Sequence, residues 1–192
     1  MKFNVGCGWR NFGDGWTHID AGDYKHLDSD DIYLGKYEEN SADLIYASHV
    51  IEYFDREEIK KLLSAWKSVL KSNGVLRIAV PNFYEIASLY IKGYNDYTLD
   101  NVLGPLYGKM SMGTETIYHR TTYDYNSLKK VLEDSGFNNV RNWDWKNTSH
   151  SQFDDHSQAY YPHFEKENGK LISLNVECVK WFHSKKNLFS YT

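Results

Sequence analysis

The sequence has few cysteines, no long apolar run and no block of basic residues, and each shortage excludes a class of protein. Its two cysteines, Cys7 and Cys178, cannot form a disulfide framework, so a reducing cytoplasmic setting is expected. No apolar run reaches the roughly 18 residues that cross a bilayer. A strand pattern that begins at Lys2 leaves no room for a signal peptide. We therefore expect no membrane partner.

Charge and size narrow the classes further. The formal net charge is −4, and Lys and Arg are not clustered, so nucleic acid is not expected as a partner. The 192 residues, 41% of them hydrophobic, suffice for a core of their own. We predict a single domain over residues 1–192.

Strand and helix patterns alternate along the chain, which predicts an α/β fold with a parallel sheet. The early strands are expected at Lys2–Val5, Trp16–Asp20, Ala42–His49 and Val75–Val80. Asp55 and Glu58 form a capping-box pattern for a long helix, and Asn73-Gly74 supplies its expected end.

The second half continues this pattern around two inserts. Asp124 is the expected cap of a second helix that ends at Gly136, and late strands are expected over 137–145 and 170–182. Residues 81–120 show mixed periodicity and several glycines, and residues 146–169 are polar and aromatic. Because α/β sheets bind ligands at the carboxyl ends of their strands, we expect both segments on the substrate side.

The first glycine loop is the clearest candidate site. Gly6-Cys7-Gly8 directly follows the first strand, and Asp20 ends the second. Glycines let a backbone approach a ligand closely, and an acid at such a position can hold ribose hydroxyls. Asp20 follows Gly6 by only 14 residues, where such loops usually need about 20, so the intervening helix is missing. A plain turn between two strands is the competing interpretation.

Six segments spread over most of the chain together carry a family resemblance. They are "NVGCG", "GWTHID", "ENSADLIYASHVIEYF", "WKSVLKSNGVLRIAVPNF", "YHRTTYDYNSLKKVLEDSGFNNV" and "ISLNVECVK". In this order they resemble a class I S-adenosylmethionine-dependent methyltransferase, of the small type associated with glycan biosynthesis. The resemblance implies a Rossmann-like three-layer sandwich with a seven-stranded and mostly parallel sheet that has one antiparallel strand. Compared with the family pattern, we expect a trimmed N-terminus, because the strand pattern begins at Lys2.

The resemblance also implies the cofactor, S-adenosylmethionine, and the residues around it. The glycine loop would approach its methionine part, Asp20 its ribose, and Asp31 with Ile32 its adenine, with Asp30 as an alternative. Ser48 and His49 would line its reactive end. The implied cofactor-binding residues are Gly6, Cys7, Gly8, Asp20, Asp31, Ile32, Ser48 and His49. The implied acceptor is a small molecule or glycan.

Three features depart from the family pattern. Asn4 stands where an acid is usual, and Trp9-Arg10 replaces a third glycine. Because the helix is missing, one side of the cofactor must be covered by residues 9–16 or by another chain. A homo-oligomer is therefore one of the two alternatives.

Transfer to a hydroxyl requires a base, for which His49 and His119 are the candidates. Structural roles compete with this interpretation: His49 as a loop cap, His119-Arg120 as partners of acids, and Glu52 as an anchor rather than a base. A polar cluster in the late insert consists of His150, Asp154, Asp155 and His156. We favour a solvated loop there and predict no metal.

Two other functions remain as alternatives. A nicotinamide-dependent oxidoreductase is disfavoured, because the third glycine of the dinucleotide fingerprint is replaced by Asn11. A non-catalytic module that binds the cofactor or a partner with the same fold is the second.

Overall fold

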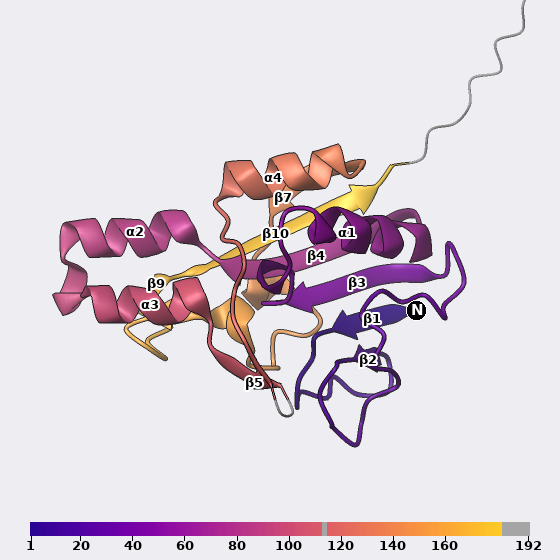
Figure 1. The fold of residues 1–192 in the computed structure, drawn as a ribbon, viewed down its shortest axis with the longest axis horizontal. Helices are drawn as coiled ribbons and strands as arrows, with labels where there is room; N and C mark the ends of the chain where they lie inside the picture. The colour runs from indigo at the N-terminus through magenta and orange to yellow at the C-terminus, as the bar shows by residue number, and fades with distance from the viewer. Residues whose placement is uncertain (113–114, 182–192) are drawn as a thin grey trace, which may run out of the picture.

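A sheet with the strand order β2-β1-β3-β4-β10-β7 forms the centre of the fold (Figure 1). The structure, a computed structural model, describes residues 1–112 and 115–181. The strands are β1 (Lys2–Val5), β2 (Thr17–Ile19), β3 (Ala42–Ser48), β4 (Leu70–Pro81), β7 (Phe137–Asn142) and β10 (Ser173–Lys180). Strands β1 to β4 pair in parallel, and β10 runs antiparallel to both β4 and β7. The expected mostly parallel sheet with one antiparallel strand is confirmed.

The main sheet contains six strands in the described chain, so the expected seven is wrong. Beyond β2 only an isolated parallel bridge joins Ile19 to Ser29. Acidic side chains bond to the backbone in this region: Asp28 accepts from the His18 amide at 2.8 Å. Asp31 likewise accepts from the amides of its own turn. Such local bonds compete with a strand ladder, which explains why no further strand forms here.

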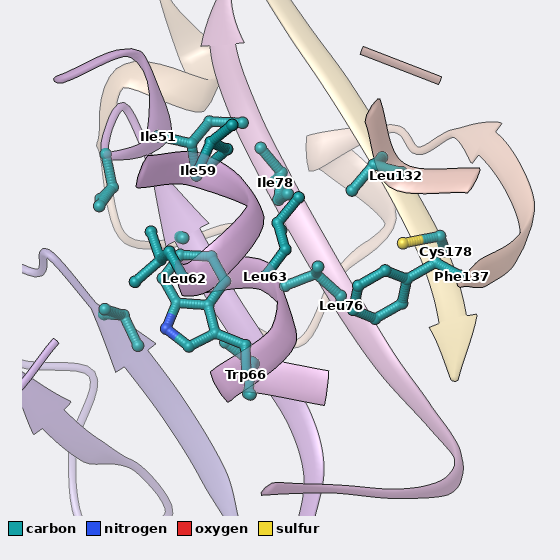
Figure 2. Close-up of a cluster of buried hydrophobic side chains, with 14 of the residues drawn as sticks. Ile51, Ile59, Leu62, Leu63, Trp66, Leu76, Ile78, Leu132, Phe137 and Cys178 are labelled. Atoms are coloured by element: carbon teal, nitrogen blue, oxygen red, sulfur yellow. The ribbon is translucent and has the colours of Figure 1, made fainter. Parts of the chain in front are cut away.

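Helices α1 (Glu58–Val69) and α4 (Tyr125–Asp134) cover one face of the sheet and enclose the main core (Figure 2). The expected cap of α4 is confirmed, since Asp124 accepts from the Ser127 amide at 2.7 Å. The expected contact of Asp55 is also present, since its carboxylate accepts from the Glu58 amide at 2.8 Å, but the turn 55–57 precedes α1 and Glu57 is the N-cap residue. The buried side chains of α1 are Ile59, Leu62, Leu63, Trp66 and Val69.

The end of the first helix was expected at Asn73-Gly74, but α1 already ends at Val69. Leu70 adopts an extended conformation and pairs with Ala42 of β3, so β4 begins immediately after α1. Asn73 has a φ of +64° and lies within β4, where the register of the pairing with β3 shifts between Ala42 and Leu44. Sheet pairing therefore overrides the stop signal in the sequence.

The opposite face of the sheet carries a layer of aromatic loops. Its cluster contains Phe12, Tyr46, Ala79 and Trp143, with Trp16, Trp145 and Phe153 packed around them. Among the described residues, no α-helical side chain belongs to this cluster. The expected third layer is therefore made of loops, because the short connection from Gly6 to Asp20 leaves no length for a helix.

The first insert forms a helical hairpin beyond the carboxyl end of β4 (Figure 1). Its elements are α2 (Phe83–Lys92), η2 (Tyr94–Asp96), α3 (Leu99–Tyr107), β5 (Met110–Met112) and β6 (Glu115–Ile117). A separate small core of Ile86, Leu89, Tyr97 and Val102 holds the hairpin together. The expectation of short helices and loops is confirmed. None of the helices in the described ranges has the length and apolar character to cross a membrane.

The late segments differ from the expected ranges in their bounds. The remaining elements are η1 (Ile51–Tyr53), η3 (Trp145–Asn147), η4 (His156–Gln158), β8 (Tyr160–Tyr161) and β9 (Lys170–Leu171). Strand β7 stops before Asp144, whose side chain caps η3. The strand expected over 170–182 is divided at Ile172 into β9 and β10, because the Ile172 amide donates to Ala159. The end of that range, Phe182, lies outside the described residues.

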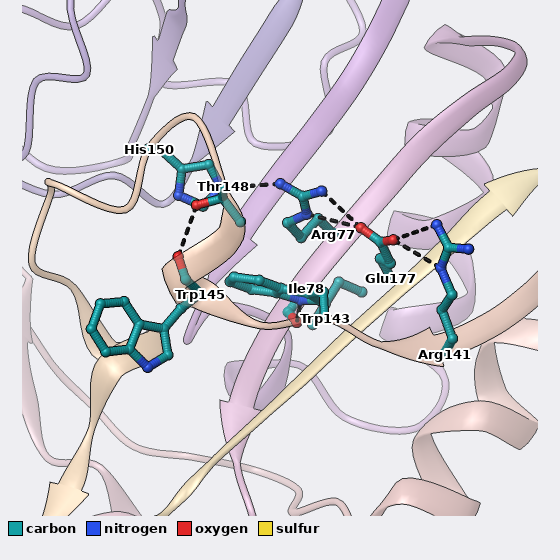
Figure 3. A network of polar contacts seen from close by, with 8 residues as sticks. All are labelled: Arg77, Ile78, Arg141, Trp143, Trp145, Thr148, His150 and Glu177. Carbon is teal, nitrogen blue, oxygen red and sulfur yellow. Dashed lines mark hydrogen bonds and ion pairs between the residues drawn. The ribbon is translucent and has the colours of Figure 1, made fainter. Parts of the chain in front are cut away.

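A charged network ties β4, β7 and β10 together on the loop-covered face (Figure 3). Glu177 accepts from Arg77 and from Arg141, each at 2.8 Å. Arg77 also lies 5.2 Å from the centroid of the Trp143 ring and 3.3 Å from a ring nitrogen of His150. The network therefore links the antiparallel strand β10 to its two neighbours in the sheet, β4 and β7.

Replacing Glu177 with Gln is expected to destabilise the protein at pH 7 by about 1–3 kcal/mol. Burial alone would raise the pKa of Glu177, but hydrogen bonds and charges from Arg77 and Arg141 outweigh it and lower this pKa. The wild type therefore gains stability above the unfolded pKa of about 4.3 and loses it as pH falls through the lower folded value. Urea unfolding at pH 7 and pH 3 should show a smaller pH effect in Glu177→Gln. Glu133→Gln, at an exposed pair on α4, is the control; equal losses in both variants would contradict the prediction.

Candidate functional site

The loop after β1 is joined to the end of β2 through the Asp20 carboxylate. Gly6 has a φ of +69°, and a Cβ there would clash with the side chain of Val50. The amides of Gly8 and Gly22 each donate to Asp20 at 2.7 Å. The structure thus brings the glycine loop and its expected acid together. Asp20 is held in a fixed orientation at the carboxyl ends of the first two strands.

A small cavity lies beside this loop. Its lining residues are Asn4, Gly6, Cys7, Arg10, Ser48, Asp155 and His156. Its volume of about 10 Å³ is close to the room that one water molecule needs. Arg10 donates to the Asp154 carbonyl at 2.7 Å, and the Tyr46 hydroxyl donates to Asp155 at 2.6 Å. The 154–156 segment is therefore fastened over the glycine loop, and a larger ligand can enter only if this segment moves.

Buried polar atoms without a partner gather at the ends of β1 and β3. Those without a hydrogen bond within the described residues are Asn4 Nδ2, Ser48 Oγ, His49 Nε2, both carboxyl oxygens of Glu52 and the Tyr123 hydroxyl. Each such atom costs about 1–3 kcal/mol. Several of them in neighbouring elements indicate groups that a ligand satisfies. These atoms fit a polar cofactor and a polar acceptor.

Cys7 lines the cavity as a neutral thiol. Its sulfur lies 3.7 Å from a ring nitrogen of His26, and the residue is buried. Burial, and then the charge of Asp20, raises the pKa of Cys7 to about 12. A protonated thiol is a poor nucleophile, so Cys7 contributes shape rather than chemistry.

Asp31 and Ile32 lie outside the small cavity, in the next loop. The Asp31 carboxylate accepts from the amides of Tyr33 and Gly35 at 3.0 and 2.7 Å. Ile32 packs against the main core, and its carbonyl accepts from the Trp66 indole at 2.7 Å. Both residues shape this loop, and their role toward adenine stays a prediction.

His49, Glu52 and His119 converge in one buried cluster, although His119 comes from the far end of the first insert. His49 Nδ1 lies 3.4 Å from Glu52 Oε1, and His119 Nε2 lies 3.8 Å from the same oxygen. Glu52 is fully buried. His49 has a φ of +55°, a conformation that is uncommon outside glycine and often found at functional sites.

Burial sets the protonation of this cluster. It raises the pKa of Glu52 to about 8, so that the carboxyl group is protonated at neutral pH. Burial, followed by the charges of His156, His119 and Arg10, lowers the pKa of His49 well below its usual range. Burial also lowers the pKa of His119. The cluster is therefore neutral near pH 7, with both imidazoles unprotonated.

The two histidines differ in what their nitrogens contact. His119 Nδ1 donates to the Pro105 carbonyl at 3.2 Å, and its Nε2 lies 3.8 Å from Glu52 Oε1, beyond hydrogen-bond distance. His49 directs one nitrogen at Glu52, while its Nε2 has no partner in the described chain. Of the two candidates, His49 is better placed to act on a ligand.

Glu52 lies in the buried cluster, whereas Arg120 lies on the surface. Glu52 was expected to be an anchor, but its side chain faces two histidines with neither oxygen hydrogen-bonded in the described chain. Its position three residues after His49, directly behind a buried strand, was the available signal. Arg120 pairs with Glu58 at 2.9 Å on the surface, as the competing interpretation proposed.

The polar cluster of the late insert is divided among separate partners. His150 contacts Arg77, Asp154 pairs with Lys166 at 3.0 Å, and Asp155 accepts from Tyr46. Within residues 1–112 and 115–181, no group of three or more His, Cys, Asp or Glu side chains is placed to hold a metal ion.

Comparisons with known proteins find one family model and several solved structures that are similar to this chain. Residues 17–78 match a family model described as a methyltransferase domain. An S-adenosylmethionine-dependent methyltransferase from Archaeoglobus fulgidus is 17% identical, with a TM-score of 0.55 over 93% of this chain and 85% of that one. One from Methanosarcina mazei is 14% identical, with a TM-score of 0.57 over 95% and 92%. No curated protein matches the chain.

A third structure has ligands in its site. It is the 1,6-didemethyltoxoflavin-N1-methyltransferase of Burkholderia thailandensis, with bound 1,6-didemethyltoxoflavin and S-adenosylhomocysteine. It is 9% identical, with a TM-score of 0.53 over 94% of this chain and 71% of that one. These neighbours show the fold, and the methyltransferase-domain model matches the part of the chain from β2 into β4.

Proposed function

We propose that the protein is an S-adenosylmethionine-dependent methyltransferase that methylates a hydroxyl of a small acceptor, with a sugar or glycan as the acceptor class. The observation that carries this proposal is the set of unpaired buried atoms beside the glycine loop. They belong to Asn4, Ser48 and His49, at the carboxyl ends of β1 and β3 where this fold binds its ligands.

Each part of the site has a role in holding the cofactor. The Gly6–Gly8 backbone gives a close approach, and Asp20 offers its free lone pairs to ribose hydroxyls. Asn4 and Ser48 supply polar atoms toward the amino-acid end. When bound, S-adenosylmethionine supplies a methyl group on a positively charged sulfur. Holding an acceptor in line with that methyl lowers the activation free energy by on the order of 7–11 kcal/mol.

His49 takes the proton of the acceptor hydroxyl in this proposal. With its own proton on Nδ1, facing Glu52, the lone pair of His49 lies on Nε2, the atom that has no partner in the described residues. When the imidazole becomes cationic, the Glu52 oxygen that lies 3.4 Å from its Nδ1 faces the new charge and stabilises it. The 154–156 segment, which covers the glycine loop, excludes water from the reacting groups.

Replacing Asp20 with Ala is expected to weaken binding of S-adenosylmethionine by on the order of 100-fold, because two charge-assisted hydrogen bonds to ribose are lost. Calorimetric titration with S-adenosylmethionine and S-adenosylhomocysteine measures this loss. The exposed neighbour Asp23→Ala is the matched control and should bind like the wild type.

The same titration, followed by turnover assays with a panel of sugar hydroxyls, tests the proposed function. Binding and methyl transfer are the expected results. Binding without turnover on any acceptor would favour the non-catalytic module. Absence of binding by the wild type, or binding of NADH in its place, would overturn the proposal.

A further inference from the structure

A groove of about 330 Å³ separates α2 from residues 168–170. This volume lies at the lower end of the range for small-molecule sites. One wall belongs to the first insert. The other comes from the end of the second insert, where the Tyr160–Tyr161 and Lys170–Leu171 strands pair. Both segments that were expected on the substrate side therefore meet here.

The groove follows the axis of α2. Tyr84, Ser88 and Lys92 line it at intervals of four residues, so they lie on one face of the helix. At 1.5 Å per residue, this stripe is about 12 Å long. An elongated ligand fits the groove better than a compact one.

The near end of the groove lies close in the chain to the buried histidine cluster. Helix α2 begins directly after β4, and the Phe83 amide donates to the Tyr123 carbonyl at 3.0 Å. The Tyr123 hydroxyl is one of the buried atoms without a hydrogen bond, and burial, followed by the charge of Glu52, raises its pKa. Tyr84, which opens the groove, follows Phe83 immediately.

The groove combines stacking surfaces with hydrogen-bonding groups. Tyr84 is 66% exposed, so its ring is available to a ligand, and Tyr94 lines the same groove. Ser88 and Asn168 add a hydroxyl and an amide. Aromatic rings interleaved with such groups suit a ligand that has both C–H faces and hydroxyls, as a sugar ring has.

The charge of the groove is opposite to that of the protein. Two ammonium groups, of Lys92 and Lys170, line it with one carboxylate, Glu85. Lys170 pairs with Glu85 at 3.3 Å, whereas Lys92 forms no ion pair with any described residue. This leaves one positive charge in a chain whose net charge is −4. Such a local field favours an anionic group on the ligand.

We propose that this groove binds the acceptor and that the acceptor is an anionic carbohydrate, with its carboxylate or phosphate at Lys92 and a sugar ring against Tyr84. The inference rests on the proposed function and specifies its substrate class. It does not require that methyl transfer be observed, because the groove is lined by residues other than those of the cofactor loop.

Ligand-observed NMR and calorimetric titration of the full chain, without S-adenosylmethionine, test the proposal. The probes are tetragalacturonate, glucose 1-phosphate and neutral maltotetraose. We expect tetragalacturonate or glucose 1-phosphate to bind at least about 10-fold more tightly than maltotetraose, and the stronger of the two identifies the anionic group. Lys92→Gln should remove this preference, and Tyr84→Ala should weaken binding of the preferred probe.

Lys60→Gln removes one exposed positive charge from α1 and is the matched control. Equal binding of charged and neutral sugars, no binding of any probe, or equal effects of Lys92→Gln and Lys60→Gln would overturn the proposal. Cofactor binding is measured in a separate titration. A failure of the groove proposal can therefore be told apart from a failure of the proposed methyltransferase function.

Discussion

Replacing His49 with Asn is expected to lower kcat by about 10²–10⁴ and leave the affinity for S-adenosylmethionine within a few-fold of the wild type. The loss follows from removing the ring of the cluster whose Nε2 is fully buried and has no hydrogen bond in the described chain. Asn is the preferred substitution because His49 has a φ of +55°, which Asn tolerates better than Ala. Loss of activity in this variant therefore does not report a misfolded loop.

The pH dependence of kcat provides a second readout for His49. Only the neutral imidazole accepts a proton, and burial lowers the pKa of His49 well below its usual range. We expect kcat to be constant through pH 7 and to fall only as pH drops below about 6.5, the ordinary value for histidine. His119→Asn is the control and should lower kcat much less, since one nitrogen of His119 already donates to the Pro105 carbonyl. Unchanged turnover in His49→Asn, or a larger loss in His119→Asn, would refute the assignment of the base.

Replacing Glu52 with Gln is expected to make the protein more stable and less active. The folded state holds the Glu52 proton up to about pH 8, whereas the unfolded chain releases it near pH 4.5. Between these values the unfolded state binds fewer protons than the folded state, so the wild type loses stability as pH rises. Gln carries no titrating proton and avoids this loss.

Thermal unfolding at pH 5 and pH 8.5 measures this effect. The melting temperature of Glu52→Gln should exceed that of the wild type at pH 8.5, by about 2–4 °C for each kcal/mol, and the difference should narrow at pH 5. Turnover should fall roughly 10-fold or more, because Gln orients His49 less well. Glu57→Gln, at an exposed position, should change neither quantity. A destabilised Glu52→Gln variant with normal turnover would mean that Glu52 is a structural anchor.

The sequence alone was enough to predict the elements whose signals are local. Apolar runs marked the central strands, and side chains at Asp55 and Asp124 marked two helix starts, because a cap bonds to amides only three residues away. The glycine loop and Asp20 were found by the same means, since strand ends and turn residues can be recognised along the chain.

Only the tertiary structure decided which polar side chains are buried and what they face. Sheet pairing ended the first helix early, and the short first connection left one face of the sheet to aromatic loops. Glu52 and His119 are 67 positions apart in the sequence, yet their side chains meet in one cluster. Burial there raises the pKa of an acid and lowers that of two histidines, and burial depends on the packing of distant segments, which local sequence patterns do not encode.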